Sequence, residues 1–390
     1  MVIPSSNTAN SIKEYYFSKK LAAIRKMIST GKEIVNLGIG NPDIPPHNSV
    51  IQELNAQSSF ENTHGYQSYR GIYNLRNAFA KWYRHYFNVS INPESEILPL
   101  QGSKSGIMYI SQAFLNKDDK VLIPNPGYPA YATGANSVGA ETMLYHLKKE
   151  NQYLPDFEEI QKYDLSNVKL MWVNYPNMPT GKNASKGLFR KLIAFGKRNN
   201  ILICNDNPYS FILNDKPLSI LSEQNAFDTA LELNSLSKSH NMAGWRIGAV
   251  FGAKEYIDVI QKIQSNFTSG MFLPVQKAAE KALNLNDEWY QNLNKIYTER
   301  IKYVWELADK LNLSYNKNSI GMFVWAEIPE YFKNSFEFSD LLLKKTGIFL
   351  TPGEIFGSMG KHYVRISLSN SIEDYKRALF LLNNEITLKN

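Results

Sequence analysis

The 390-residue sequence contains one cysteine, Cys204, so no disulfide bond can form within a chain. Cys204 ends the apolar run 201–204, where a small buried hydrophobic residue is the natural interpretation. No apolar stretch approaches the about 20 residues that a membrane-spanning helix requires. The N-terminus also lacks the basic and then apolar pattern of a signal peptide. These absences predict a cytoplasmic protein with no membrane partner.

The sequence also lacks any concentration of charge of one sign. It has 43 basic and 36 acidic residues, a formal net charge of +7, and the basic residues stand singly or in pairs such as Lys19-Lys20 and Lys148-Lys149. Nothing resembles a nucleic-acid-binding stripe, and we expect no nucleic-acid partner. The small positive excess fits phosphate or carboxylate ligands, but it fits an ordinary basic surface as well.

What is present is enough apolar material for a large core, since 43% of the residues are hydrophobic. Residues 12–30 read as a helix, and the Gly- and Pro-rich segment 36–48 follows as a loop. From about residue 97, short apolar runs alternate with helical stretches, and each run ends in a polar or Gly/Pro turn. This pattern predicts an α/β fold whose mostly parallel, seven-stranded sheet is flanked by helices. The runs are residues 96–100, 120–124, 141–147, 169–176, 201–206, 229–236 and 246–253.

After about residue 285 the pattern changes to a long helix over 286–311, apolar runs at 322–328, 348–353 and 363–369, and a helix over 335–345. These elements predict a smaller α+β domain. We therefore expect an N-terminal arm that joins the small domain (1–48), a large α/β domain (49–285) and a C-terminal small domain (286–390).

Unusual polar and Gly/Pro residues follow five of the predicted strands, and ligands of open α/β sheets bind at such strand ends. These residues are Gly102, Pro126, Asn174, Asp206 and Ser235. Residues 101–106 (Gln-Gly-Ser-Lys-Ser-Gly) join a strand to a helix, so their free amides and the Ser103 hydroxyl can hold an anion. A Gly-containing turn with a serine cap gives the same pattern without a ligand. The segment lacks the spacing of a Walker loop, and residues 38–42 lack the third glycine of a dinucleotide fingerprint.

The segment around Lys238 is more specific. Lys238 follows an apolar run, stands among serine hydroxyls and precedes Gly-Trp-Arg-Ile-Gly at 244–248. A sheltered lysine can be a neutral nucleophile that condenses with an aldehyde. Ser235, Ser237 and Arg246 can bind a phosphate beside it. A lysine next to a phosphate site indicates an aldehyde cofactor that carries a phosphate.

With these motifs the sequence resembles the fold-type I, class I/II aminotransferases, which use pyridoxal 5'-phosphate. The resemblance runs from about Gly40 to Arg365. It implies that Lys238 holds the cofactor as a Schiff base. Asn-Asp-x-Pro-Tyr at 205–209 implies that Asp206 pairs with the protonated ring nitrogen and that Tyr209 hydrogen-bonds the ring hydroxyl. A carboxylate at that nitrogen keeps the ring cationic, so that the ring can accept electrons from the substrate. Lys238, Asp206 and Tyr209 are the predicted catalytic residues.

The resemblance assigns further positions. Tyr128, in Pro-Gly-Tyr-Pro, is expected to stack on the cofactor ring. Arg365, in Tyr-Val-Arg-Ile-Ser, is expected to bind the substrate α-carboxylate, with Gly40 and Tyr128 also at the substrate. Tyr66 resembles a tyrosine that reaches the phosphate of the neighbouring subunit, which implies a homodimer with shared active sites. The full predicted cofactor-binding set is Gly102, Ser103, Lys104, Tyr128, Asn174, Asp206, Tyr209, Ser235, Ser237, Lys238, Arg246 and Tyr66, and no metal is expected.

One position departs from the family. Residues 178–181 read Met-Pro-Thr-Gly where the family has Asn-Pro-Thr-Gly, and that asparagine donates to the cofactor ring hydroxyl. A thioether cannot donate a hydrogen bond. Either Asn174 or Asn177 replaces the donor, or Tyr209 acts alone.

The implied reaction is ping-pong transamination between an amino acid and a 2-oxo acid, with Lys238 as Schiff-base partner and general base. Residues 265–272 contain no arginine where dicarboxylate-specific relatives have one, and aromatic residues are frequent, which favours neutral, aromatic or mixed amino donors. Diaminopimelate or another biosynthetic amino acid stays open. The same fold also supports C–S lyases and synthases, and a non-catalytic binding protein is a further alternative.

A hydrolase of the serine β-lactamase type is the alternative from another class. Ser235-x-x-Lys238, Tyr290-x-Asn292 and Lys345-Thr346-Gly347 occur in its order. Those enzymes need the Lys-Thr-Gly on a strand, whereas here it ends a predicted helix. This alternative also gives no role to Asp206, Tyr209 or Tyr128.

Overall fold

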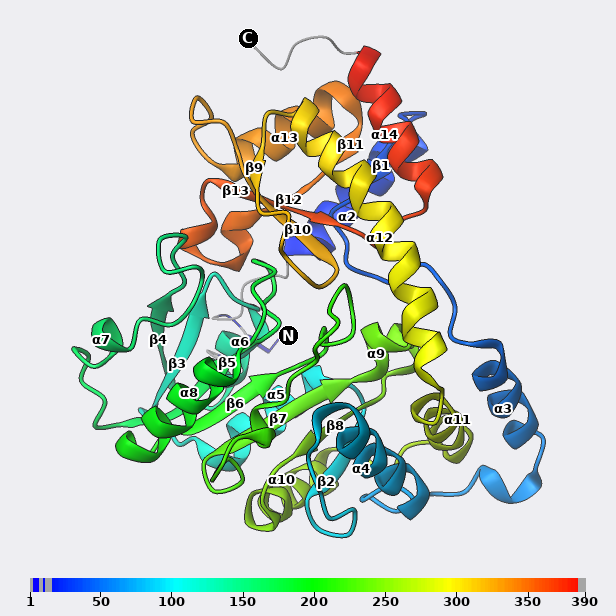
Figure 1. Ribbon diagram of the computed structural model, residues 1–390, viewed down its shortest axis with the longest axis vertical. Helices are drawn as coiled ribbons and strands as arrows, with labels where there is room; N and C mark the ends of the chain where they lie inside the picture. Colours follow the sequence, from blue (N-terminus) through cyan, green and yellow to red (C-terminus); the bar gives the residue numbers. More distant parts are fainter. Residues whose placement is uncertain (1–2, 7–9, 11–15, 385–390) are drawn as a thin grey trace.

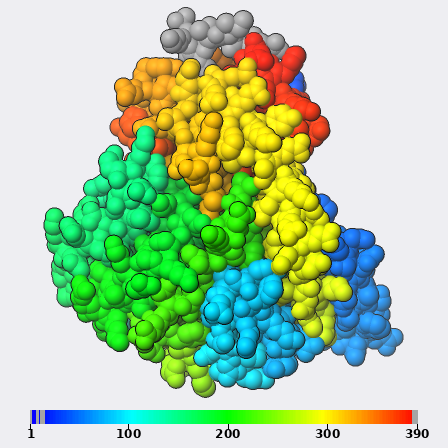
Figure 2. Space-filling view, in the orientation of Figure 1, coloured from blue at the N-terminus to red at the C-terminus, as the bar shows by residue number. Residues whose placement is uncertain are grey.

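The computed structural model describes residues 3–6, 10 and 16–384. Figure 1 shows a large sheet with helices on both faces, and a smaller group of strands and helices above the sheet. The long helix α12 (Asp287–Lys310) runs from one part to the other. In Figure 2 the yellow and orange C-terminal segments sit directly on the green middle of the chain.

The seven-stranded sheet predicted from the sequence is confirmed. Its strands are β2 (Ile97–Leu100), β3 (Lys120–Asn125), β4 (Glu141–His146), β5 (Val168–Val173), β6 (Leu202–Asp206), β7 (Ala230–Ser235) and β8 (Gly248–Phe251). They lie in the order β2-β8-β7-β6-β5-β3-β4. The pairs β3–β4, β3–β5, β5–β6 and β6–β7 are parallel, whereas β8 is antiparallel to both β2 and β7. The carboxyl ends of β3, β5, β6 and β7 therefore meet at one edge.

The strands are apolar on both sides because helices cover both faces. Phe79 of α4, Phe189 of α8 and Ala278 of α11 pack on one face. Ile107 of α5 and Ile257 of α10 pack on the other, where Cys204 is buried as expected. The helices of this part are α3 (Asn48–Ser58), α4 (Tyr73–Phe87), α5 (Ser103–Phe114), α6 (Ala130–Ser137), α7 (Phe157–Ile160), α8 (Lys186–Asn199), α9 (Leu236–Ser239), α10 (Lys254–Phe267) and α11 (Leu273–Leu283).

The smaller part has its own apolar core, in which α12, α13 and α14 pack against a four-stranded sheet of order β12-β13-β10-β9. A parallel pair, β1–β11, ties the N-terminal segment to it. The strands are β1 (Val35–Asn36), β9 (Ser314–Tyr315), β10 (Phe323–Glu327), β11 (Ile348–Phe349), β12 (Thr351–Pro352) and β13 (Tyr363–Ser367). The remaining helices are α2 (Tyr16–Ser29), α13 (Ser335–Thr346) and α14 (Ile372–Asn384). Short 3-10 turns are η1 (Glu61–Thr63), η2 (Ile220–Ser222), η3 (Ala243–Trp245), η4 (Gly353–Phe356) and η5 (Ser358–Gly360).

Two local predictions need adjustment. The helix expected over 12–30 covers 16–29, and residues 12–15 lie outside the described part of the chain. The apolar run at 348–353 is not one strand but two, because β11 pairs with β1 and β12 pairs with β13. Within residues 3–6, 10 and 16–384, no helix combines the length and apolar character needed to cross a membrane.

Candidate active site

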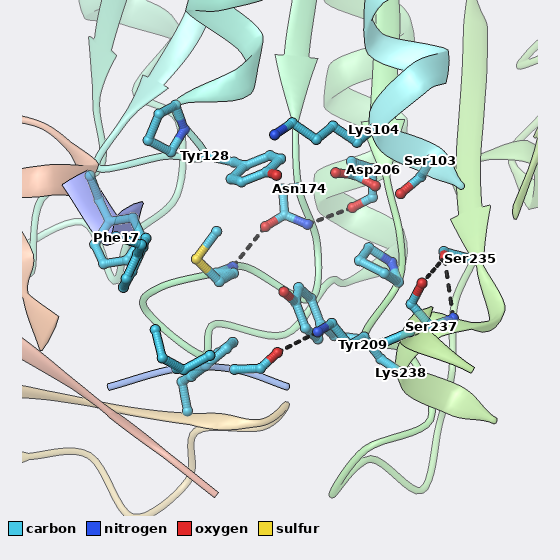
Figure 3. Close-up of a pocket in the computed structure, with 18 of the residues that line it drawn as sticks. Phe17, Ser103, Lys104, Tyr128, Asn174, Asp206, Tyr209, Ser235, Ser237 and Lys238 are labelled. Carbon is cyan, nitrogen blue, oxygen red and sulfur yellow. Dashed lines mark hydrogen bonds between the residues drawn. The ribbon is translucent and has the colours of Figure 1, made fainter. Parts of the chain in front are cut away.

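A cavity of about 460 Å³ lies at the carboxyl edge of the large sheet, beneath β10 and β13. It gathers predicted residues that are up to 325 positions apart in sequence, from Gly40 to Arg365. Figure 3 shows Tyr128, Asp206, Tyr209 and Lys238 around this common space, with Ser235 and Ser237 at one side and Phe17 at the other. The predicted residues on its wall are Gly40, Ser103, Lys104, Tyr128, Asn174, Asp206, Tyr209, Ser235, Ser237, Lys238, Arg246 and Arg365.

Lys238 lies in the short helix α9, directly after β7, and the Ser235 side chain caps this helix. Its Nζ donates a hydrogen bond to the Gly40 carbonyl oxygen at 2.5 Å. Burial lowers the pKa of Lys238 to about 8, and the positive charges of Arg365 and Arg246 act in the same direction. A lysine with such a pKa is partly neutral near pH 8, as a nucleophile or a proton acceptor must be.

Asp206 ends β6 and is 5% exposed. Its Oδ2 accepts a hydrogen bond from the Tyr131 hydroxyl at 3.1 Å, while Oδ1 is buried without a hydrogen-bond partner in the described part of the chain. Burial raises the pKa of Asp206 to about 7; the bond from Tyr131 opposes this shift and the nearby Glu232 adds to it. An unsatisfied buried carboxylate oxygen on a cavity wall is suited to accept a hydrogen bond from a cationic ring nitrogen.

A group of hydrogen-bond donors lies at the start of α5. Gly102 precedes this helix with φ 84° and ψ 154°, and a Cβ at this position would lie 2.2 Å from Nη2 of Arg246. The missing side chain therefore lets the guanidinium approach the helix N-terminus. Ser235 Oγ donates to Ser237 Oγ at 2.8 Å nearby. Main-chain amides, hydroxyls and a guanidinium together match the needs of a phosphate.

Arg365 is 6% exposed on β13, and its environment explains its orientation. Nη2 donates to the Gly38 carbonyl at 2.9 Å, and Nη1 contacts Met178 Sδ at 3.4 Å. The guanidinium also stacks over Phe323, with 3.9 Å between its carbon and the ring centroid. The side chain is thus held flat at the cavity wall.

The loop around Met178 shows which asparagine faces the cavity. Asn174 lines the cavity, donates through Nδ2 to the Asp206 carbonyl at 2.5 Å, and accepts from the Met178 main-chain N–H at 2.7 Å (Figure 3). Asn177 instead holds the loop together, because it donates to the Asn174 carbonyl and accepts from Thr180. Asn174 is thus on the cavity wall, whereas Asn177 is not among the residues that line it.

Tyr66 does not reach the cavity of its own chain. It lies in the loop between η1 and α4 with 95% of its surface exposed. Gly102 is not among the residues that line the cavity, but its main chain lies against the Arg246 guanidinium.

Sequence reasoning missed two sets of residues. Tyr131, the partner of Asp206, lies three positions after Tyr128 in the same turn region, so helical spacing could have suggested it. The second set is an apolar wall from elements far apart in sequence, and no local signal connects its members. This wall consists of Phe17, Leu21, Ile39, Met178, Phe323 and Phe356.

Comparisons with known proteins identify the family of this chain. Residues 32–380 match the family model described as aminotransferase class I and II. The chain is 40% identical to transaminase BacF of Bacillus subtilis over 378 residues, which are 96% of this chain and 95% of the relative. It is 38% identical to the LL-diaminopimelate aminotransferase of Natranaerobius thermophilus, over 96% of this chain and 97% of the relative. The substrate-bound structure of BacF superposes with a TM-score of 0.94 at 37% identity and covers 98% of both chains.

Proposed function

Since this chain belongs to the class I and II aminotransferases, a family that depends on pyridoxal phosphate, we propose that it transfers the amino group of a neutral apolar or aromatic amino acid to a 2-oxo acid. The observation that carries the donor class is the apolar wall opposite Lys238 and beside Arg365. The family assignment removes the β-lactamase alternative, and Lys345-Thr346-Gly347 indeed ends helix α13 instead of lying on a strand.

The residues of the cavity fit pyridoxal phosphate. Lys238 would hold its aldehyde carbon, Asp206 Oδ1 its ring nitrogen, and Tyr128 its ring face. Asn174 and Tyr209 would meet the ring hydroxyl. The phosphate would be held by the main chain after Gly102 together with Ser103, Lys104, Ser235, Ser237 and Arg246. When bound, this cofactor supplies an electron-accepting ring that stabilises negative charge at the substrate α-carbon.

Side chains of the protein itself would bind and orient the substrate and move its proton. Arg365 grips the α-carboxylate and so orients the amino acid with its α-hydrogen toward Lys238. With its Nζ free, Lys238 would act as the general base that accepts the substrate α-proton. Its lowered pKa suits this task because the neutral amine is populated near neutral pH. The Asp206 carboxylate would favour the protonated form of the ring nitrogen.

The donor class follows from what a side chain would meet beyond the α-carbon. Phe17 and Leu21 stand one turn apart on α2 and line the cavity. The rings of Phe17, Phe323 and Phe356 all lie beside the Arg365 guanidinium. With Arg365 engaged by the α-carboxylate, a second charged group among these rings would lose hydration at a cost. An apolar side chain would instead gain by burial, by roughly 1.5–3 kcal/mol when fully buried.

Turnover tests this proposal. The loaded enzyme, with 2-oxoglutarate as acceptor, should convert phenylalanine, leucine and methionine with kcat/KM values well above that of aspartate. Lys238→Ala is the control for chemistry and should lose activity by at least the 10²–10⁴-fold that general base catalysis contributes. Equal or better use of aspartate would contradict the donor class but leave transamination standing.

Diaminopimelate is the second candidate donor. Several relatives are named LL-diaminopimelate aminotransferase. LL-diaminopimelate therefore belongs in the same screen. If it is the preferred donor, its kcat/KM should exceed those of phenylalanine, leucine and methionine.

We also propose a homodimer that shares its active sites. One surface carries exposed rings from two adjoining loops, 60–73 and 267–272, which touch where His64 packs on Phe272 with ring centroids 5.6 Å apart. Exposed aromatic rings gathered in this way indicate a contact surface. They are Phe60, Tyr66, Tyr69, Tyr73, Phe267 and Phe272.

The remaining sequence-based expectations are proposals as well. The division into 1–48, 49–285 and 286–390 is supported by the separate apolar cores around the two sheets. The cytoplasmic location rests on the sequence alone.

A further inference from the structure

A short stretch of main chain connects two of the basic residues of the cavity, Arg365 and Lys238. Residues 37–43, here called the strap, follow β1 and cross from the C-terminal sheet toward Lys238. The Gly38 carbonyl accepts from Arg365 Nη2 at 2.9 Å and from Thr351 Oγ1 at 2.7 Å. The Gly40 carbonyl accepts from Lys238 Nζ at 2.5 Å. The position of the strap therefore determines where both side chains find an acceptor.

The far end of the strap is fixed by an ion pair with α12. Arg300 Nη1 and Nη2 each donate to one carboxylate oxygen of Asp43 at 2.7 Å, so the contact is bidentate. Arg300 Nη1 also donates to the Leu368 carbonyl at 3.2 Å, directly after β13, the strand that carries Arg365. Arg300 is buried, and Asp43 is partly buried. The guanidinium thus joins the strap, α12 and the end of β13.

The same helix also contacts the Lys238 segment. Trp289 Nε1 donates to the Ser239 carbonyl at 2.9 Å, and the Tyr290 hydroxyl lies 3.0 Å from His240 Nε2. Residues 289 and 300 are about 16 Å apart along α12 at 1.5 Å per residue. In Figure 1 the segment after β1 passes beside α12. The helix therefore holds the strap at one point and the lysine segment at another.

We propose that the Asp43–Arg300 ion pair is a positioning device for substrate binding, which fixes the strap so that the Gly38 and Gly40 carbonyls orient Arg365 and Lys238. Neither Asp43 nor Arg300 lines the cavity, so both act through the strap. The inference rests on the proposed role of Arg365 in carboxylate binding. A displacement of about 1 Å at a binding group can cost up to 10²-fold in rate, so a loosened strap should be measurable.

The test measures ligand binding apart from turnover. The cofactor-loaded protein is titrated calorimetrically with 3-phenylpropanoate, which has the carboxylate and ring of a donor but no amino group to react. Asp43→Asn removes the negative charge and keeps the side-chain shape. Arg300→Lys keeps the positive charge but cannot form the bidentate contact. Both should bind this ligand roughly tenfold more weakly and raise the donor KM more than they lower kcat, with cofactor affinity unchanged. Asp43→Glu should recover part of the affinity.

Glu94→Gln is the matched control, because the Arg76–Glu94 pair also joins a buried arginine to an exposed loop, at 2.9 Å, but lies away from the cavity. It should change thermal stability without changing ligand affinity. If Asp43→Asn does not fold, Arg300→Lys carries the test. Unchanged ligand affinity in the folded variants, or an equal loss of cofactor affinity, overturns the inference. Absence of binding to the unmodified protein rejects instead the carboxylate role of Arg365.

Discussion

Burial moves the pKa values of Lys238 and Asp206 toward neutrality from opposite sides, to about 8 and about 7. Each charged form loses hydration in the cavity, which favours a neutral lysine and a protonated carboxyl group. A cationic ligand group at Asp206 would restore the carboxylate, and a covalent partner for Lys238 would remove its charge. The cofactor-free site is thus electrostatically prepared for the cofactor.

The pKa of Lys238 gives a first prediction. Arg365 lowers it, so Arg365→Leu should raise the pKa of Lys238 toward its ordinary value, because loss of a positive neighbour favours the charged amine. The pH at which Lys238 is half acetylated in the cofactor-free protein should rise, as followed by peptide mass spectrometry against the exposed Lys186. Arg365→Lys keeps the charge and should leave this pH near that of the unmodified protein. An unchanged value in Arg365→Leu would mean that Arg365 does not act on Lys238.

Met178 gives a second prediction. Its main-chain N–H donates to Asn174 and its Sδ contacts Arg365, at a position where the family has a hydrogen-bond donor. Met178→Asn should shift the spectrophotometric titration of the bound cofactor to lower pH, because a new donor to the ring oxygen favours its anionic form. Met178→Leu adds no donor and should not shift it. No difference between the two variants would indicate that Asn174 already fills the donor position.

At the scale of elements, the strands and the residues at their ends were predictable because both depend on local pattern. Short apolar runs gave the seven strands, and unusual polar residues after them gave Asp206 and Lys238. The apolar wall was not predictable, since Phe17 on α2, Phe323 on β10 and Phe356 on η4 meet only through tertiary packing. The Asp43–Arg300 pair joins residues 257 positions apart, so it was not predictable from the sequence either.

The start of α5 gives a third prediction. Gly102 has φ 84° and ψ 154°, a conformation almost restricted to glycine, and a Cβ there would collide with Arg246. Gly102→Ala should weaken binding of pyridoxal phosphate by at least roughly tenfold, given a strain of about 1–3 kcal/mol in addition to the displaced guanidinium. Equilibrium titration of the cofactor-free protein measures this. Gly244→Ala, near Arg246 but with no atom within 4 Å of the added carbon, should bind normally. Equal affinities would show that the phosphate is held elsewhere.

At the scale of the whole molecule, Tyr66 is the predicted site residue that does not reach the cavity of its own chain. The family resemblance implies that it contacts the cofactor phosphate of a neighbouring subunit, and in the single chain it is exposed beside the other surface rings of residues 60–73 and 267–272. A two-fold pairing of chains through this surface would make sharing reciprocal, because each subunit offers the same patch to the other. Neither the sequence pattern of one chain nor its fold can show what a second chain contributes, so this assignment needs an experiment on mixed subunits.

Mixing two inactive variants gives that experiment. In a dimer of a Tyr66→Ala chain and a Lys238→Ala chain, sharing between subunits puts both defects in one site and leaves the other site intact. Since half of randomly mixed dimers are hybrids, about a quarter of the sites should be active. Tyr66→Ala must first be shown to be strongly impaired alone, and exchange of subunits must be verified by native mass spectrometry. A chain with both substitutions, mixed with Lys238→Ala, is the control and should recover nothing, because no site then has both residues. If Tyr66 acted within its own chain, every hybrid site would lack one residue or the other. Verified exchange without recovered activity would therefore return Tyr66 to the role of an ordinary surface residue.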